Sequence, residues 1–520
     1  MISIIGMAGV LPGAVSLNDF WENVSCGFDL IINNKNDDCN ENKYIYSRGV
    51  VDIKEQLKFQ SFGYSKKDDD IVDSQLPALL ETVCNAIDDS GLELKKTGAD
   101  VGVFISASSN LESLEKQCDK LLKEEVGSAQ VRFLCDREFW AQYISYKLNL
   151  TGPSLAVHSA CSSSLTALHF AIQSLRNGDC DYAIVAAASL NENPYKPYRY
   201  QEGGIYSKAG KCLPFTNVSD GTVPGNGVVA LILSKSDVKK FNKCYANIIS
   251  SVCNNDGSDK IGFTAPSYTG HKKAILKAFE QCDTRPEEIQ YVEPHGTGTL
   301  IGDKVEFSVL NEIYGYKNDK TFLGTLKANI GHLDAAAGLA GIVKLALSLK
   351  HRTIPKTCQS VLDVAHHDVD NSQFKFSSER CHWAIDKGEI RKASISALGI
   401  GGTNVHMILQ ESDEVSNTSY KQEPTFSYTS TDKKYLDSCT AIINNVKNID
   451  NIEEGVTNIW YEILGSSNIE DDFFDIGGSS LHAIQLIDRI QSEWGVEIDF
   501  EDFFERSSLA DLIKTCIENK

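Results

Sequence analysis

The 520-residue sequence has few basic side chains for its size: Lys and Arg number 50 against 71 Asp and Glu, a net charge of −21. An acidic surface repels phosphate backbones, so nucleic-acid binding is a poor candidate function. The sequence also lacks apolar runs near the ~20 residues that a membrane helix needs. The longest runs, YAIVAAASL and GVVALIL, are much shorter. We therefore expect neither a membrane span nor a nucleic-acid partner.

Export and metal-binding signals are missing as well. The first residues, MISIIGMAGVLPG, contain no basic n-region and no long apolar h-region, so a secretory signal is not expected. None of the 15 cysteines forms a C-x-x-C pair or alternates with histidine at zinc-ligand spacing. The cysteines are therefore expected to be reduced, mostly buried thiols of a cytoplasmic protein without a metal site.

The composition and the apolar pattern of the sequence change twice along the chain. Residues 1–411 alternate short apolar runs with helix-like segments, which predicts an α/β domain with a parallel or mixed sheet covered on both faces. The strand-like runs include ISIIG, DVGVFIS, YAIVAAA, VVALILS and ASISALGIGG. Residues 412–447 are polar and read as a linker. Residues 448–520 predict a small all-α bundle, and from Asn451 onward they hold 16 acidic and 4 basic side chains.

Cys161 stands at a favourable place for chemistry. The apolar LAV is followed by HSACSSS and then by an apolar-periodic run that ends at Gly178, a pattern that predicts strand, tight turn and helix. Cys161 then lies at or just before the helix start, where free N–H groups favour an anion. We expect a lowered thiol pKa and a usable nucleophile. The alternative is one more buried cysteine among fifteen.

Two histidines occupy loops of small residues. His295 lies in VEPHGTGT, where glycines allow a ligand to approach the backbone and the hydroxyls of Thr297 and Thr299 can bind a polar chain. His332 lies in NIGHLDAAAG, just before an Ala-rich helix. Neutral imidazoles there could stabilise negative charge on a carbonyl oxygen. Each histidine could equally be a structural residue, and spacing alone does not bring them together.

Together these motifs resemble the β-ketoacyl synthase family, over residues 1–410. By this resemblance Cys161 carries the acyl group, His295 and His332 are the catalytic histidines, and Lys327 and Glu306 are a buried supporting pair. GIGGTNVH, with Gly399, Ile400 and Gly401, matches the glycine-rich loop that forms an oxyanion hole with the Cys161 N–H and gates the pocket. Thr297 and Thr299 would contact pantetheine.

The resemblance implies a thiolase-like fold, with duplicated βαβαβ halves in a five-layer arrangement and usually a homodimer. It also implies a two-part reaction. An acyl group moves from a carrier to the cysteine, and a malonyl-type thioester then loses CO2 and attacks it. Two rival functions stay open: acyl transfer between carriers without elongation, and a non-catalytic scaffold that presents a carrier.

The acidic tail is similar to acyl and peptidyl carrier proteins through NIEDDFFDIGGSSLHAIQL. Ser480 falls on the position that receives 4′-phosphopantetheine, although a serine here could simply cap a helix. No acyltransferase segment lies between the linker and the carrier-like tail. The implied partners are therefore a separate acyltransferase, a phosphopantetheinyl transferase, malonyl-type and acyl carrier thioesters, and neighbouring assembly-line proteins.

Several positions depart from the common ketosynthase pattern. They are His158, Thr216 and Asn226 where acidic residues are frequent, Leu398 where an aromatic residue is usual, and Ile400 at the gate. The departure at the gate leaves the acyl preference open. Together with YQEGGI, GNG and FTAPS, the pattern looks most like ketosynthases of hybrid peptide–polyketide assembly lines.

Overall fold

The structure, a computed structural model, divides the chain into two compact units that are described separately. The described residues are 1–33, 44–53, 71–94, 98–123, 128–235, 243–260, 262–315, 320–412, 452–464, 506–519 and isolated positions between 473 and 503. The expected linker, 412–447, lies almost entirely outside them, so the domain boundaries stay predictions.

One sheet of eleven strands forms the centre of the first unit. In sheet order the strands are β14 (Phe374–Lys375), β12 (Thr321–Leu323), β11 (Tyr291–Glu293), β16 (Lys392–Leu398), β17 (Thr403–Gln410), β10 (Ala246–Asn255), β1 (Ile2–Val10), β9 (Gly227–Lys235), β7 (Tyr182–Ser189), β5 (Val101–Ala107) and β6 (Ser154–Ala156). The five apolar runs quoted from the sequence are β1, β5, β7, β9 and β16. One expectation was wrong: the glycine-rich loop covers only residues 399–402, because Thr403 onward pairs as β17.

The sheet is built from two copies of one topology. Antiparallel pairing of β1 with β10 joins the copies at the centre. Outward from β1 the order is β9, β7, β5 and β6, and outward from β10 it is β17, β16, β11 and β12. In each copy the two inner pairings are antiparallel and the two outer ones are parallel. These are the duplicated halves of a thiolase-like fold.

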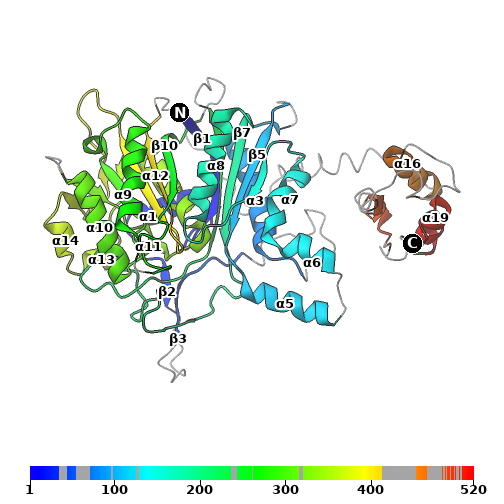
Figure 1. Cartoon of the computed structure of the whole chain (residues 1–520), viewed down its shortest axis with the longest axis horizontal. Helices are drawn as coiled ribbons and strands as arrows, with labels where there is room; N and C mark the ends of the chain where they lie inside the picture. Colours follow the sequence, from blue (N-terminus) through cyan, green and yellow to red (C-terminus); the bar gives the residue numbers. More distant parts are fainter. Residues whose placement is uncertain are drawn as a thin grey trace. The chain divides into compact units, whose positions relative to one another are not determined.

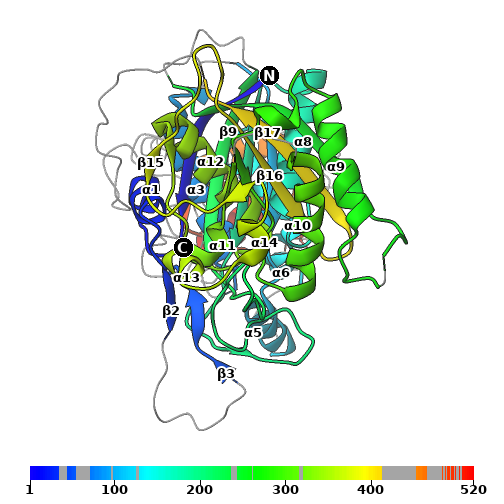
Figure 2. The same ribbon diagram turned by 90° about the vertical axis from the view of Figure 1, so that its left-hand side faces the viewer.

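Helices complete five layers. The helices α8 (Ser163–Asn177) and α12 (Ala337–His351) pack against each other and against strands of both halves. The helix α3 (Gln75–Ser90) covers β1, β9 and β7 from one outer side, and α9 (Tyr268–Glu280) covers β10 and β17 from the other (Figures 1 and 2). Because α12 lies in the middle layer, all its residues from 338 to 349 are buried, and it is apolar on nearly every side.

The remaining elements surround this core. They are the helices α1 (Leu17–Ser25), α5 (Leu111–Leu122), α6 (Ser128–Cys135), α7 (Trp140–Leu148), α10 (Leu300–Tyr314), α11 (Leu326–Ile330), α13 (Gln359–Leu362) and α14 (His367–Asp370), the 3₁₀ turns η2 (Arg137–Phe139), η3 (Pro286–Glu288) and η4 (Asp334–Ala336), and the strands β2 (Ile31–Asn33), β3 (Tyr44–Ile45), β4 (Ser47–Gly49), β8 (Tyr198–Arg199), β13 (Thr353–Ile354) and β15 (Cys381–His382). Short strands such as β12 and β14 are too brief to leave a periodic pattern in the sequence.

The second unit is helical where it is described. Its helices α16 (Ile452–Leu464) and α19 (Leu509–Glu518) pack together, and Ser508 caps α19 by accepting the Asp511 N–H. The buried side chains of its core include Val456, Ile459, Trp460, Leu486, Ile487, Ile490, Leu509 and Leu512. Apolar side chains from α16, from α19 and from the isolated described positions between them thus share one core. Across the described parts of both units, no helix is long and apolar enough to span a membrane.

Candidate active site

Cys161 lies in a tight turn between β6 and α8, the thiol turn (residues 159–162). Ala160 has a φ of 53°, a left-handed conformation that costs energy for a residue with a Cβ. Serine hydroxyls hold the turn: Ser162 Oγ donates to the Ser159 carbonyl at 2.9 Å, and Ser163 Oγ donates to the Ala160 carbonyl at 2.6 Å. The sequence thus placed the turn and helix correctly, and the turn directs Cys161 toward other loops.

The environment of the Cys161 sulfur differs from the expectation. The residue is 7% exposed, its Sγ donates to Asp334 Oδ1 at 3.7 Å, and the Ile400 N–H lies near enough to favour the charged sulfur. Burial and the nearby Asp334 carboxylate raise the pKa of the thiol to about 12, and the Ile400 N–H and Lys327 offset this only in part. The predicted lowering of the pKa was wrong, because the helix N-terminus is outweighed by desolvation and a facing negative charge.

His295 follows β11 and is fixed through its peptide. Both Glu306 oxygens accept backbone N–H groups, from His295 at 2.7 Å and from Gly296 at 2.8 Å, and Lys327 Nζ donates to the His295 carbonyl. Burial raises the pKa of Glu306 to about 7, although the two N–H groups oppose this. Lys327 and Glu306 therefore meet at one peptide as a clamp on His295, and their charges face each other through it.

His332 is held in one tautomer. Its Nδ1 accepts the Asp334 N–H at 3.2 Å, so the ring proton lies on Nε2. Nε2 is buried and has no hydrogen-bond partner among the described residues. Burial, with a contribution from the Lys327 charge, lowers the pKa of His332 to about 3, so the ring is neutral near pH 7. The ring centroids of His332 and His295 lie 5.6 Å apart and nearly perpendicular, so the two expected histidines do meet.

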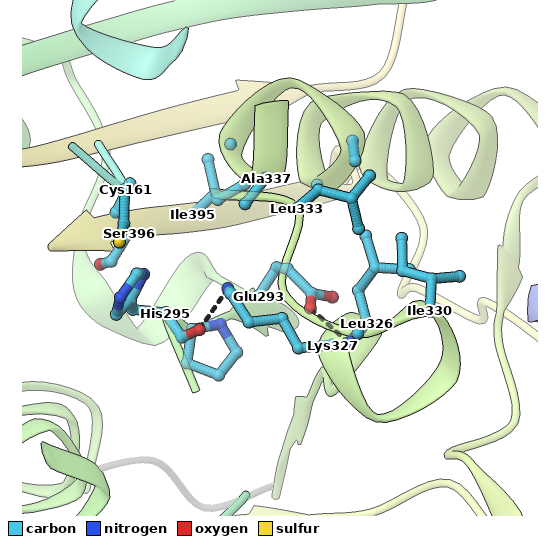
Figure 3. A pocket seen from close by; sticks show the side chains of 16 residues that line it. Cys161, Glu293, His295, Leu326, Lys327, Ile330, Leu333, Ala337, Ile395 and Ser396 are labelled. Carbon is cyan, nitrogen blue, oxygen red and sulfur yellow. Dashed lines mark hydrogen bonds between the residues drawn. The ribbon is translucent and has the colours of Figure 1, made fainter. Parts of the chain in front are cut away.

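Cys161, His295 and Lys327 line one cavity at the start of α12 (Figure 3). Its apolar wall comes from α11, α12 and β16, and its polar wall includes Ser396 and Glu293. Burial and the nearby charge of Lys327 hold the pKa of His295 well below its usual range, so both histidines can donate from neutral rings. The cavity therefore brings a thiol and an imidazole N–H together away from bulk water.

Sequence reasoning missed two acidic residues at this site. Asp334, with a φ of 43°, touches both Cys161 and His332, and its proximity to His332 in the chain was the only available signal. Glu293 forms a buried ion pair with Lys344 at 2.7 Å. Lys344, in the middle of the apolar helix α12, was a usable sign that a carboxylate lies opposite it.

The glycine loop at residues 399–402 lies against the thiol turn. A Cβ on Gly399 would lie 2.4 Å from the Ser159 carbonyl oxygen, so only glycine fits there. Gly401 has a φ of 103° and lies against the ring of Phe263, and Ile400 is 40% exposed. The loop therefore packs against the turn that carries the sulfur, and its roles as oxyanion loop and gate stay predictions.

The other residues singled out in the sequence differ in how deeply they are buried. Thr297 and Thr299 are half-buried with their hydroxyls 3.0 Å apart. His158 is exposed near the thiol turn, whereas Thr216 and Asn226 are buried, Thr216 Oγ1 donating to the Leu213 carbonyl. Ser480 lies outside the described residues.

Family comparisons agree with this geometry. Residues 1–238 match the β-ketoacyl synthase N-terminal domain, and residues 245–360 match the β-ketoacyl synthase C-terminal domain. Residues 454–516 match the phosphopantetheine attachment site, a domain that carries covalent 4′-phosphopantetheine.

Individual relatives are much larger proteins. The chain is 34% identical over 438 residues to polyketide synthase PksN of Bacillus subtilis, a match that covers 81% of this chain and 8% of that protein. It is 31% identical over 432 residues to the pikromycin polyketide synthase component PikAII of Streptomyces venezuelae, covering 79% of this chain and 11% of the relative. The chain thus spans about a tenth of the length of these two relatives.

Solved ketosynthases share the fold. Ketosynthase twelve of the bacillaene polyketide synthase of Bacillus amyloliquefaciens has a TM-score of 0.73 at 31% identity, covering 79% of this chain and 73% of that one. The ketosynthase from module 1 of the bacillaene synthase of the same species has a TM-score of 0.70 at 34% identity, covering 79% and 75%. With its thiolase-like fold and these matches, the chain belongs to the β-ketoacyl synthase family and also carries a phosphopantetheine attachment domain.

Proposed function

We propose that the first unit catalyses a decarboxylative Claisen condensation between an acyl group on Cys161 and a malonyl-type thioester on a carrier protein. One observation carries the proposal. The neutral His332 holds its ring proton on a buried Nε2 that has no partner among the described residues, beside His295 and the loop of Cys161. A buried donor without an acceptor costs about 1–3 kcal/mol, and a substrate oxygen would supply the acceptor.

The first half-reaction is acyl transfer. The Cys161 sulfur attacks the carbonyl carbon of an acyl–carrier thioester, the bond from that carbon to the pantetheine sulfur breaks, and the thiol proton goes to the departing thiolate. The carbonyl oxygen becomes negative in between. In this proposal the Ile400 N–H, which lies near the Cys161 sulfur, donates to that oxygen.

The second half-reaction is decarboxylation and attack. The malonyl thioester carbonyl accepts hydrogen bonds from the His295 and His332 rings while the C–C bond to the carboxylate breaks and CO2 leaves. The enolate carbon then attacks the Cys161 thioester, forming the new C–C bond and releasing the cysteine. Donors from neutral rings suit this step, because they stabilise the enolate oxygen without protonating it fully.

Lys327 and Glu306 act on this chemistry through His295. They bind the N–H and the carbonyl of His295, so they fix where its ring stands. Thr297 and Thr299 are half-buried on the following loop, and we assign them to contacts with the pantetheine arm of the incoming carrier. Ile400, partly exposed over the thiol turn, would select the acyl chain.

Ser480 is the proposed attachment point of 4′-phosphopantetheine in the second unit, through its hydroxyl. Loading then needs a phosphopantetheinyl transferase and a separate acyltransferase, and the product passes to neighbouring assembly-line proteins. The cytoplasmic location and the hybrid peptide–polyketide subclass remain predictions from the sequence.

We also propose a homodimer through the first unit. The strand β6 lies at one of the two edges of the sheet, pairs only with β5 among the described strands, and exposes 48% of Leu155. An unpaired edge of this kind is a template for a second copy.

The test uses the full chain after phosphopantetheinylation, with butyryl-N-acetylcysteamine as acyl donor and malonyl carrier protein as extender. Intact-mass analysis should show butyryl on Cys161 and a β-ketohexanoyl product on the carrier. Cys161→Ala should abolish both, and His332→Ala should retain acyl capture but lose the product. Cys180→Ala, which removes another buried thiol, is the matched control and should retain both.

The rival functions give different results. Acyl transfer between carriers without any gain from malonate would replace condensation with a gatekeeping role. Unchanged product formation after alanine replacement at Cys161 would instead support a carrier-presenting scaffold, and would overturn the proposal.

A further inference from the structure

A buried chain of hydrogen bonds runs beneath the active site and has no part in the mechanism above. His271 Nε2 lies 3.1 Å from Ser396 Oγ, which lies 2.9 Å from His406 Nδ1. His406 Nε2 lies 3.4 Å from the Tyr314 hydroxyl, which lies 3.0 Å from Ser394 Oγ. All five side chains are at most 3% exposed. The chain joins α9, β16, β17 and α10.

Only one assignment of donors and acceptors along these hydrogen bonds avoids a buried N–H or O–H without an acceptor. His271 Nδ1 is buried without a partner among the described residues, and an orphaned lone pair costs less than an orphaned N–H. His271 therefore carries its proton on Nε2 and donates to Ser396, Ser396 donates to His406 Nδ1, and His406 donates from Nε2 to Tyr314. Burial lowers the pKa of His271 to about 4 and that of His406 to about 3, so both rings are neutral.

Ser396 connects the chain to the reaction centre. It lines the same cavity as Cys161 and His295 (Figure 3). On the hairpin of β16 and β17, Ser396 is the register partner of His406. The glycine loop begins three residues after Ser396, and its Ile400 N–H lies near the Cys161 sulfur. Only residues 397 and 398, at the end of β16, separate Ser396 from this loop.

His271 ties this hairpin to a different layer. It stands in the first turn of α9, which lies beside β17 and α10 in Figure 2. A second tie from the same region reaches the hairpin beyond the loop, because Asn404 Nδ2 donates to Asp256 Oδ1 at 2.6 Å and the Asp256 N–H donates to the Gly402 carbonyl at 2.9 Å. The loop is therefore held on both sides, and the His271 tie is the one that also reaches the cavity.

We infer that His271 is a positioning residue for the oxyanion loop: by donating to Ser396 it sets the distance between the Ile400 N–H and the carbonyl oxygen of a thioester on Cys161. This inference rests on the proposed acyl transfer. Oxyanion donors act over about 2.7–3.1 Å, and loss of one whole donor costs about 10²–10³ in rate. A loop that is displaced but keeps its donor should lose less of this rate, so we expect acylation to slow about tenfold.

The experiment compares two reactions of the same sulfur in the full chain. Acylation by butyryl-N-acetylcysteamine develops an oxyanion, whereas alkylation by iodoacetamide does not. His271→Leu should slow acylation about tenfold and change alkylation less than about threefold. His271→Gln, whose amide can still donate to Ser396, should restore acylation to within about threefold of wild type. Ser396→Ala should show the same selective loss as His271→Leu, and it replaces that variant if His271→Leu does not fold.

His169→Leu is the matched control, because His169 makes a comparable bond to Ser251, at 2.8 Å, away from the cavity. It should leave the ratio of acylation to alkylation unchanged. Equal slowing of both reactions by His271→Leu, no slowing of acylation, or no rescue by glutamine would overturn the inference. A wild-type protein that is alkylated but never acylated would instead refute the proposed function, so the two failures are distinguishable.

Discussion

Replacing Asp334 by Asn should make Cys161 more reactive toward simple electrophiles. At 3.7 Å and an effective dielectric constant of about 20, one carboxylate charge disfavours the thiolate by about 4 kcal/mol, or about 3 in pKa. Because the charge is shared with the more distant carboxylate oxygen, we expect the pKa to fall by about 2–3 from its value of about 12. The thiolate fraction at pH 8 then rises about 10²- to 10³-fold. A thiolate of lower pKa is also a weaker nucleophile, which removes nearly half of that gain on a logarithmic scale. The net increase is about 10- to 40-fold.

The assay is the rate of iodoacetamide alkylation of the peptide containing Cys161, read by mass spectrometry between pH 7 and 11. The exposed Cys118 serves as an internal standard in every sample and should react at the same rate in both proteins. Asp363→Asn, which removes the same charge from α13's C-terminal end, is the matched variant. An unchanged or lower rate at Cys161 in Asp334→Asn would show that the carboxylate does not control the thiol.

Three further predictions follow from burial and close contacts. Lys344→Met removes the ion-pair partner of the buried Glu293, so the free energy of unfolding in urea should fall by about 3 kcal/mol. Gly399→Ala should abolish acyl capture while the protein stays folded by circular dichroism, because its Cβ meets the thiol turn, whereas Gly262→Ala faces open space and should behave as wild type. Burial depresses the pKa of His271, so this ring opposes stability as pH falls below its usual 6.5; in His271→Gln the loss of unfolding free energy between pH 6 and 4.5 should be shallower by up to about 1.4 kcal/mol per pH unit in urea titrations at each pH.

Local pattern was enough to place Cys161 in its turn and His332 before its helix, because both depend on neighbours within a few residues. The sign of the thiol pKa shift was not accessible in this way. It depends on Asp334, which is 173 positions away in the chain, and on how completely the fold covers the sulfur. The clamp of Lys327 and Glu306 on the His295 peptide likewise arises from elements that only the three-dimensional packing brings together.

The strands show the same limit. Long buried runs such as β7 and β9 stand out by composition alone, since both of their faces are covered and all but their ends are apolar. The first residues of β17 follow Gly402 and are mostly polar, so the sequence predicted a loop there. In the structure they pair with β10 and β16. Register and pairing partners, and not the residues themselves, made it a strand.

The duplication explains how residues from distant parts of the chain converge. Cys161 precedes α8 in the first half and His332 precedes α12 in the second, at equivalent steps of the same topology. The two helices pack against each other in the middle layer, and the Leu339 N–H bonds to Ser164 Oγ at 3.2 Å, which joins their first turns. Each half therefore contributes one loop of the site, and both loops lie next to the contact between α8 and α12. A site divided in this way is sensitive to any change that slides α8 along α12, even one far from the sulfur, because such a change moves the thiol and the imidazole in opposite directions.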